Sequence, residues 1–140
     1  MLIKIFFAWC LLAATVAIHA AGLAIILRPF FDLTYADNGV SKSTWRIIRV
    51  AWWMIIIHML EIAMWGLFYW WQKCMPDAET AFYFAGVTYT TIGYGDVVLP
   101  VEWRIFGPIE GLTGILMCGL STASFFAVVS HLYRIKIGKE

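Results

Sequence analysis

The sequence predicts an all-α membrane protein with three transmembrane helices and one short re-entrant helix. Hydrophobic residues make up 62% of the 140 residues and charged residues only 14%, whereas a soluble domain carries about 25% charged residues. Three apolar runs are long enough to cross a bilayer, which takes about 20 residues in a helix. A fourth run is too short. The length leaves no room for a second domain of ordinary size.

The first predicted span covers residues 1–28. Its apolar run, residues 5–27, holds no charged side chain and ends at Arg28-Pro29. The run imitates a signal peptide, but it is longer than the usual apolar region of about 7–15 residues. Ile18 and His19 also occupy positions that a cleavage site keeps small. We therefore expect an extra N-terminal transmembrane helix.

A polar connection, residues 29–44, leads to the second predicted span, residues 45–72. The connection is rich in turn-forming residues such as Asp37, Asn38 and Gly39. Aromatic side chains gather near the end of the second span, at residues 65–71. Amphipathic rings favour the level of the lipid headgroups, so this cluster predicts a membrane interface.

Residues 78–90 predict a short helix that enters the membrane without crossing it. Asp77 suits its N-cap, because the carboxylate can accept hydrogen bonds from the free N–H groups of the first turn. The apolar stretch after it is too short to span a bilayer. A last span, residues 103–133, and a basic tail, residues 135–140, follow.

The positive charges predict the orientation of the chain, because short cytoplasmic loops are enriched in Lys and Arg. Seven of the ten lie in the 28–49 stretch and the C-terminal tail: Arg28, Lys42, Arg46, Arg49, Arg134, Lys136 and Lys139. We therefore expect the N-terminus outside and the C-terminus in the cytoplasm. Arg46 and Arg49 are three residues apart, but no span carries a repeated Arg series, so we expect interface anchors rather than a voltage sensor.

The segment Thr-Thr-Ile-Gly-Tyr-Gly-Asp, residues 90–96, lies between the short helix and the last span. A potassium ion without its water shell needs rings of oxygen atoms, and backbone carbonyls supply them when they all point inward. That geometry takes alternating backbone conformations, which Gly93 and Gly95 tolerate. Irregular backbone at membrane depth occurs only where it is buried in protein or lines a water-filled cavity. The segment therefore predicts an ion path.

Residues 45–134 resemble the pore domain of the potassium channel superfamily, with an outer helix, a pore helix, a filter and an inner helix. Residues 90–96 match the Thr-Val-Gly-Tyr-Gly filter signature, with Ile in place of Val. The resemblance implies a filter at residues 91–95 and K+ ligands at Thr91, Ile92, Gly93 and Tyr94. It implies that four chains form one pore in a cell membrane, the inner membrane of a bacterium.

Other positions take roles from the same resemblance. Filter support is implied for Thr90, Gly95 and Asp96, and bending of the inner helix for Gly114 and Gly119. Two departures stand out. The first span is additional to the two-helix plan, and Val87 replaces a glutamate that pairs with the filter aspartate in some bacterial channels. Slow filter inactivation through such a pair is therefore not implied here.

Two carboxylates, Glu61 and Glu110, fall inside predicted spans. A charge at mid-membrane costs roughly 2.5–3.5 kcal/mol on insertion scales, so both are functional suspects. We expect them to support the filter by bonding pore-helix or filter groups from behind, with His58 one turn from Glu61 and able to share its proton. Structural bracing without a gating role is the alternative. His131 could sense cytoplasmic pH or be an interfacial ring.

One face of the last span carries Ile115, Thr122, Phe126 and Ser130 near helical spacing. By resemblance this face lines the cavity, and Phe126 is a candidate constriction that would act by dewetting. Packing against lipid or a neighbouring subunit is the alternative.

These features predict a potassium-selective channel subunit that conducts K+ passively. A weakly selective cation channel and a non-conducting modulatory subunit are the alternatives. We expect no enzyme, because no nucleophile–base set, metal cluster or phosphate loop is visible, and Cys10, Cys74 and Cys118 have no metal spacing. The expected partners are K+, further copies of the chain and lipid, with no nucleic acid and no cofactor besides K+ in the filter.

Overall fold

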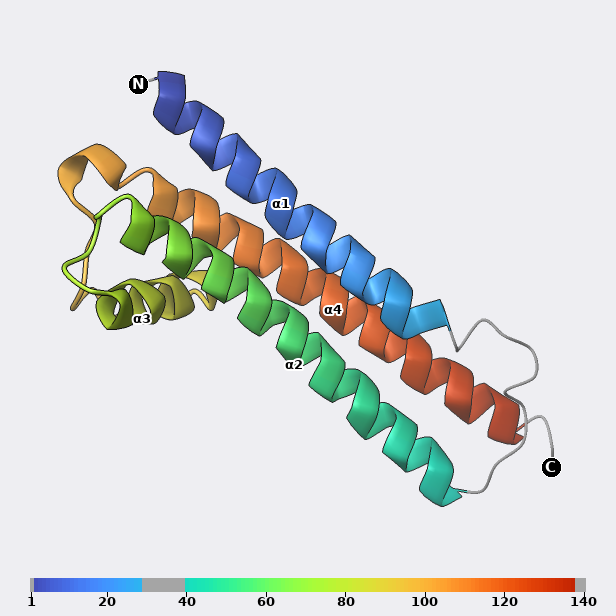
Figure 1. Cartoon of the computed structure of the whole chain (residues 1–140). Helices are drawn as coiled ribbons and strands as arrows, with labels where there is room; N and C mark the ends of the chain where they lie inside the picture. The colour runs from blue at the N-terminus through green and yellow to red at the C-terminus, as the bar shows by residue number, and fades with distance from the viewer. Residues whose placement is uncertain (1, 29–39, 138–140) are drawn as a thin grey trace.

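The computed structural model describes residues 2–28 and 40–137, and the regular structure in this part of the chain is helical. Three long helices, α1 (Leu2–Leu27), α2 (Val40–Trp71) and α4 (Phe106–Ile137), run side by side (Figure 1). The short α3 (Ala78–Tyr89) lies at one end, beside α2. Most of the predicted connection, residues 29–44, lies outside the described residues.

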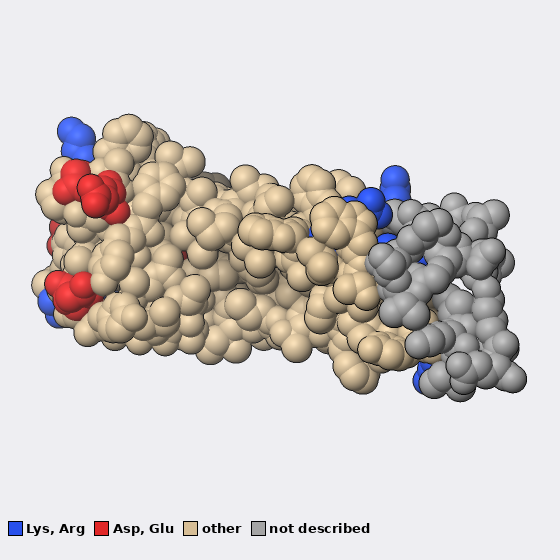
Figure 2. Space-filling view, turned by 90° about the horizontal axis from the view of Figure 1, so that it is seen from below, with Lys and Arg blue, Asp and Glu red and all other residues tan. Residues whose placement is uncertain are grey.

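The three long helices have the length and composition to cross a membrane, over Leu2–Leu27, Ser43–Trp71 and Phe106–Arg134. On the face drawn in Figure 2, Asp and Glu side chains gather at one end, and Lys and Arg lie at both ends. A wide uncharged band separates the two ends. This distribution fits a bilayer around the middle of the molecule, because charged side chains are costly in its apolar core.

The outer helix begins earlier than the sequence predicted. α2 starts at Val40 rather than at residue 45, because residues 40–44 contain no Gly or Pro that would interrupt a helix. It ends in a left-handed turn at Lys73, whose φ is 55°. The N–H of Cys74 bonds the carbonyl of Tyr69 at 2.9 Å, and that of Lys73 bonds Trp70 at 3.0 Å. This pattern caps the last carbonyls of a helix.

The re-entrant helix α3 begins where Asp77 was predicted to cap it. The Oδ1 atom of Asp77 accepts from the Thr80 N–H at 2.8 Å, and Oδ2 accepts from the Thr80 hydroxyl at 3.0 Å. The helix has 12 residues, which is about 18 Å at 1.5 Å per residue and too short to cross a bilayer. At its end, the Thr90 hydroxyl bonds the Gly86 carbonyl at 2.6 Å.

The inner helix begins later than predicted. Val101–Trp103 form a 3-10 turn, and α4 starts at Phe106 rather than at residue 103. Pro108 in the first turn of α4 is tolerated, because its missing N–H would have no partner within the helix there. α4 continues to Ile137, so the predicted tail at residues 135–140 begins as helix. Residues 138–140 lie outside the described part.

Two apolar clusters hold the long helices together, with a polar layer between them. One cluster, near α3, includes Leu11 of α1, Trp65 of α2 and Met117 of α4. The other includes Leu23, Val50, Met54 and Val128. Between these heights α1, α2 and α4 carry four buried polar residues: Thr15, His19, Glu61 and Ser121. Buried polar groups at membrane depth need partners, so this layer is a candidate site.

Candidate functional site

The segment after α3, residues 90–96, has an alternating backbone. The angle φ is 63° at Thr91, 57° at Gly93 and 78° at Gly95, whereas Ile92 and Tyr94 are outside this left-handed region. The segment stays attached to α3, because the N–H groups of Ile92 and Gly93 both point to the Val87 carbonyl, at 3.0 and 3.2 Å. Residues 90–96 are exposed in the single chain.

Asp96, at the end of this segment, is held by α3. The hydroxyl of Tyr83 donates to Asp96 Oδ2 at 2.7 Å. This hydrogen bond favours the ionised carboxylate and lowers the pKa of Asp96. The sequence analysis considered only Val87 as the position of a partner for Asp96, and it missed Tyr83, one helical turn earlier on α3.

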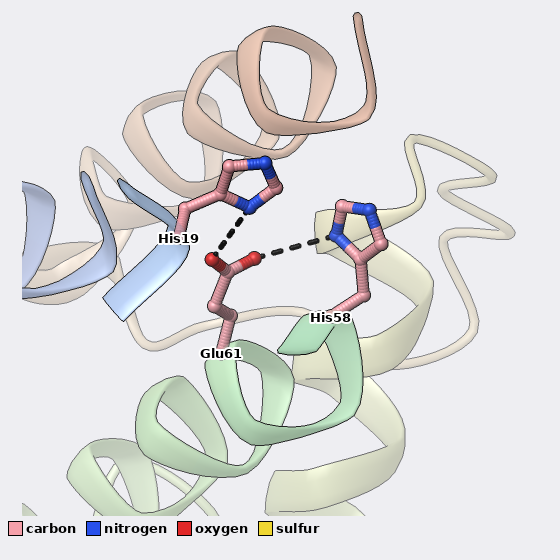
Figure 3. Close-up of side chains that lie close together, drawn as sticks. All are labelled: His19, His58 and Glu61. Carbon is pink, nitrogen blue, oxygen red and sulfur yellow. Dashed lines mark hydrogen bonds and ion pairs between the residues drawn. The ribbon is translucent and has the colours of Figure 1, made fainter. Parts of the chain in front are cut away.

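Glu61 lies at the centre of the buried polar layer, with none of its surface exposed. His19 Nδ1 of α1 is 2.9 Å from Glu61 Oε1, and His58 Nδ1 is 3.3 Å from Oε2. Figure 3 shows both imidazoles turned toward the two carboxylate oxygens. The hydroxyl of Tyr89, the last residue of α3, also donates to Glu61 Oε2. Glu61 thus contacts the last residue of α3, and its role in filter support stays a prediction.

Ser121 of α4 closes this arrangement into a ring. Its Oγ is 3.1 Å from Nε2 of His58 and 3.3 Å from Nε2 of His19. The two imidazoles therefore share Glu61 on one side and Ser121 on the other. We call His19, His58, Glu61, Tyr89 and Ser121 the polar cluster; it draws a side chain from each of the four helices.

A second contact between α1 and α2 lies one turn from the polar cluster. Trp65 Nε1 donates to Thr15 Oγ1 at 3.1 Å, and the Thr15 hydroxyl donates to the Leu11 carbonyl at 2.9 Å. Both Trp65 and Thr15 are fully buried. At the end of the molecule near α3, Lys4 Nζ donates to the Glu102 carbonyl at 2.8 Å and lies over the Trp103 ring.

Glu110 is also fully buried, but its partner is on α2 rather than on the pore helix. The Tyr69 hydroxyl donates to Glu110 Oε2 at 2.7 Å. The other oxygen, Oε1, has no hydrogen-bond partner among the described residues. Glu110 was predicted to bond the pore helix or the filter, but in the structure it accepts its hydrogen bond from the outer helix α2. The role of Glu110 in filter support stays a prediction.

The two glycines predicted to bend α4 have different surroundings. A Cβ atom at Gly114 would overlap the carbonyl oxygen of Tyr89. At Gly119 it would meet no described atom within 4 Å. Close packing against α3 thus gives Gly114 a structural reason to be glycine, and its bending stays a prediction.

Three of the four residues on the face predicted to line the cavity are exposed in the single chain, and the fourth, Ser130, is half-buried. Ile115 is 58% exposed and Phe126 71% exposed, and Thr122 is exposed with its hydroxyl on the Cys118 carbonyl at 2.9 Å. Such a face can meet a cavity, lipid or another copy. The lining role therefore stays a prediction.

The comparison with protein families fits this geometry. A family model described as "Ion channel" matches residues 55–131, more than half of the chain. The chain belongs to this ion channel family. The match spans α3, the segment at residues 90–96 and most of α2 and α4, which together form a potassium-channel-type pore unit rather than an enzyme fold. As an ion channel with three membrane-capable helices, the chain is a multi-pass membrane protein. No curated protein and no solved structure matches it significantly.

Helix α1 lies outside the matched residues, yet it contributes His19 to the polar cluster. Sequence reasoning expected no metal cluster and noted His19 only as a poor cleavage-site residue. His19 and Glu61 are 42 residues apart, so no short spacing reveals them. A histidine alone in an otherwise apolar span was the available signal.

Proposed function

We propose that four copies of the chain form a potassium-selective channel with a filter at residues 91–95. The observation that carries this proposal is the alternation of backbone angles, with positive φ at Thr91, Gly93 and Gly95 and none at the residues between them. Alternation between left- and right-handed regions turns successive carbonyl groups toward the same side of the chain. In a four-fold arrangement those carbonyls would form rings that replace the hydration shell of K+.

The proposed ligands are the carbonyls of Thr91, Ile92, Gly93 and Tyr94, with the Thr91 hydroxyl at the inner end. The C-terminal end of α3, at Tyr89, lies next to this segment. A helix C-terminus carries a partial negative charge, which favours a cation nearby. The pore itself would need no cofactor besides the K+ ions.

Exposure in the single chain supports assembly of several copies. Ile92 is 55% exposed and Tyr94 69% exposed, although both side chains are large. In the proposed assembly they point away from the ion and pack behind the filter. One filter segment per chain then calls for four chains, because each ring of carbonyls takes one from each subunit.

We propose that the end of the molecule carrying α3 faces outward. Lys4 bonds the Glu102 carbonyl at this end, so the N-terminus lies on the same side as the acidic loop residues. The positive charges support the same orientation. Short cytoplasmic loops are enriched in Lys and Arg, and the topology predicted from the sequence puts four arginines on the side away from α3: Arg28, Arg46, Arg49 and Arg134. The acidic outer end would raise the local concentration of cations. The membrane would be a cell membrane, by resemblance that of a bacterium.

The experiment is a current recording from purified protein in a planar bilayer under opposed K+ and Na+ gradients. We expect a reversal potential near the potassium equilibrium value. Gly93→Ala should abolish the current, because Ala is strained at a φ of 57°. Gly107→Ala is the matched control, since a Cβ there meets no described atom within 4 Å and Gly107 has no positive φ.

Two outcomes would contradict the proposal. A reversal potential near zero would make the protein a weakly selective cation channel. If correctly assembled protein carries no current in symmetric K+ over a wide range of pH and voltage, the chain is better explained as a non-conducting modulatory subunit.

A further inference from the structure

We propose that His19, His58 and Glu61 form a binding site for a transition-metal dication such as Zn²⁺, with a water molecule in the fourth position. The three residues each offer a ligand atom, and these atoms all lie within 4.8 Å of one another. The proposal concerns metal binding and does not depend on whether the pore selects K+.

The separations of the ligand atoms suit one ion. Zinc binds nitrogen and oxygen ligands at about 2.0–2.1 Å in a tetrahedron, so neighbouring ligand atoms lie about 3.3 Å apart. Oε1 of Glu61 is 2.9 Å from His19 Nδ1, and Oε2 of Glu61 is 3.3 Å from His58 Nδ1, so each imidazole faces its own carboxylate oxygen. The Tyr89 hydroxyl is 3.0 Å from His58 Nδ1. Each of the three residues thus offers a ligand atom within 4.8 Å of those of the other two, and a bound ion would draw them closer together.

The hydrogens available in the polar cluster argue for a cation at this place. With Glu61 ionised and both imidazoles neutral, the side chains of His19, His58, Tyr89 and Ser121 carry one hydrogen each. The Tyr89 hydroxyl donates its hydrogen to Glu61, and the Ser121 hydroxyl can donate to only one of the two imidazoles. One ring nitrogen without a hydrogen therefore faces an oxygen that has no hydrogen to give it, and the two lone pairs repel each other. A cation held by the two Nδ1 atoms removes this mismatch.

Ser121 then takes a defined place behind the metal. With both Nδ1 atoms on the ion, both Nε2 atoms carry hydrogen and can donate to Ser121 Oγ, at 3.1 and 3.3 Å. Histidines that bind metals almost always donate their second N–H to an oxygen in this way, and the contact fixes the ring orientation. The structure already holds this outer contact for both imidazoles.

The ligand types select a class of ion. Imidazole nitrogens suit Zn²⁺, Co²⁺, Ni²⁺ and Cu²⁺, whereas Mg²⁺ and Ca²⁺ prefer oxygen ligands. The Glu61 carboxylate supplies negative charge to a site that is fully buried at His19 and Glu61. The side chain of His58 is 19% exposed in the single chain. A bound ion would join α1 to α2, and Glu61 would still accept from Tyr89 at the end of α3.

The test is metal binding by the intact protein, purified in detergent from metal-limited cells. Addition of Co²⁺ should give the visible absorption bands of tetrahedral coordination, and dialysis against Zn²⁺ should leave about one ion per chain. His19→Gln and Glu61→Gln should each remove this signal. Ser121→Ala should weaken binding by about 10–100-fold, because it removes only the outer contact.

His131→Gln is the matched control, because His131 is exposed and lies outside the polar cluster. It should bind like the wild type. Size-exclusion chromatography checks that each variant is assembled. If a variant of a ligand residue fails to fold, the metal affinity of Ser121→Ala tests the proposal instead. The proposal is overturned if the assembled wild type binds neither Co²⁺ nor Zn²⁺. The polar cluster would then be a hydrogen-bonded ring of side chains that holds an extra proton in place of a metal ion. Equal binding by wild type and His19→Gln would also overturn it.

Discussion

Gly114 of α4 packs directly against the backbone of Tyr89, the last residue of α3. A Cβ atom at Gly114 would overlap the Tyr89 carbonyl oxygen and would lie 2.9 Å from its carbonyl carbon. Backbone atoms cannot move aside as a flexible side chain can. The inner helix therefore fixes the end of the pore helix, from which the segment at residues 90–96 starts.

Gly114→Ala should destabilise the assembled protein, because the added methyl group forces α3 and α4 apart. Overpacking of this kind costs about 1–3 kcal/mol. The thermal unfolding midpoint in detergent measures the effect. Gly119→Ala is the control, since its Cβ would meet no described atom within 4 Å. If Gly114 serves only as a hinge, Gly114→Ala will unfold like the wild type and change gating alone.

Tyr69→Phe should destabilise the protein by about 1–3 kcal/mol, because it leaves the buried Glu110 carboxylate without its described hydrogen bond. Replacement of both partners by apolar groups, Tyr69→Phe with Glu110→Leu, should recover part of the loss. Denaturant unfolding in mixed micelles compares the variants. Tyr133→Phe is the control, because Tyr133 is 59% exposed. Equal stability of Tyr69→Phe and wild type would show that Glu110 finds another partner.

Thr15→Val should loosen α1 from the rest of the chain. The substitution keeps the shape but removes the oxygen that accepts from Trp65 Nε1, and hydrogen bonds between membrane helices contribute about 0.6 kcal/mol on average and up to about 1.7. The thermal unfolding midpoint in detergent reports the loosening of α1. Thr122→Val serves as control, because its hydroxyl bonds only its own helix. An unchanged midpoint would assign α1 docking to apolar contacts.

Asp96 should ionise at lower pH in the wild type than in Tyr83→Phe. The Tyr83 hydrogen bond lowers the pKa of Asp96, so its stabilising effect is complete above the ordinary aspartate pKa of about 3.9 and is lost as the pH falls through the lowered value. Infrared difference spectra, with Asp96→Asn to assign the carboxyl band, follow the titration. Asp77, whose pKa is lowered by Thr80 instead, should titrate identically in both proteins. A shift of both carboxyls would point to a general change in the outer loops.

Local rules predicted the elements of this fold. Long apolar runs predicted the three spans, and Asp77 followed by Ala78 and Glu79 predicted the start of α3, because a cap depends only on neighbouring residues. The starts of α2 and α4 were wrong by a few residues. Ser and Thr near residue 43 suit a cap but also continue a helix, and a 3-10 turn at Val101–Trp103 delays α4.

The polar cluster depended on information that local rules lack. His58 and Glu61 are one turn apart, so their proximity was predictable. The contacts of His19 and Ser121 depend on how α1 and α4 rotate about their own axes and at what height they pack. Apolar residues surround both positions on all sides of their helices, so no stripe in the sequence indicates the rotation.

The attachment of α1 has a mechanical consequence. Lys4 ties its beginning to the Glu102 carbonyl, and His19 ties its middle to Glu61, which also accepts from the end of α3. Lateral tension that moves α1 within the bilayer would thus reach the start of the segment at residues 90–96 through three side chains, His19, Glu61 and Tyr89. The half of α4 beyond Ser121 would not have to transmit it. In the proposed channel, stretching of the membrane would act on residues 90–96 before it acts on the far end of α4.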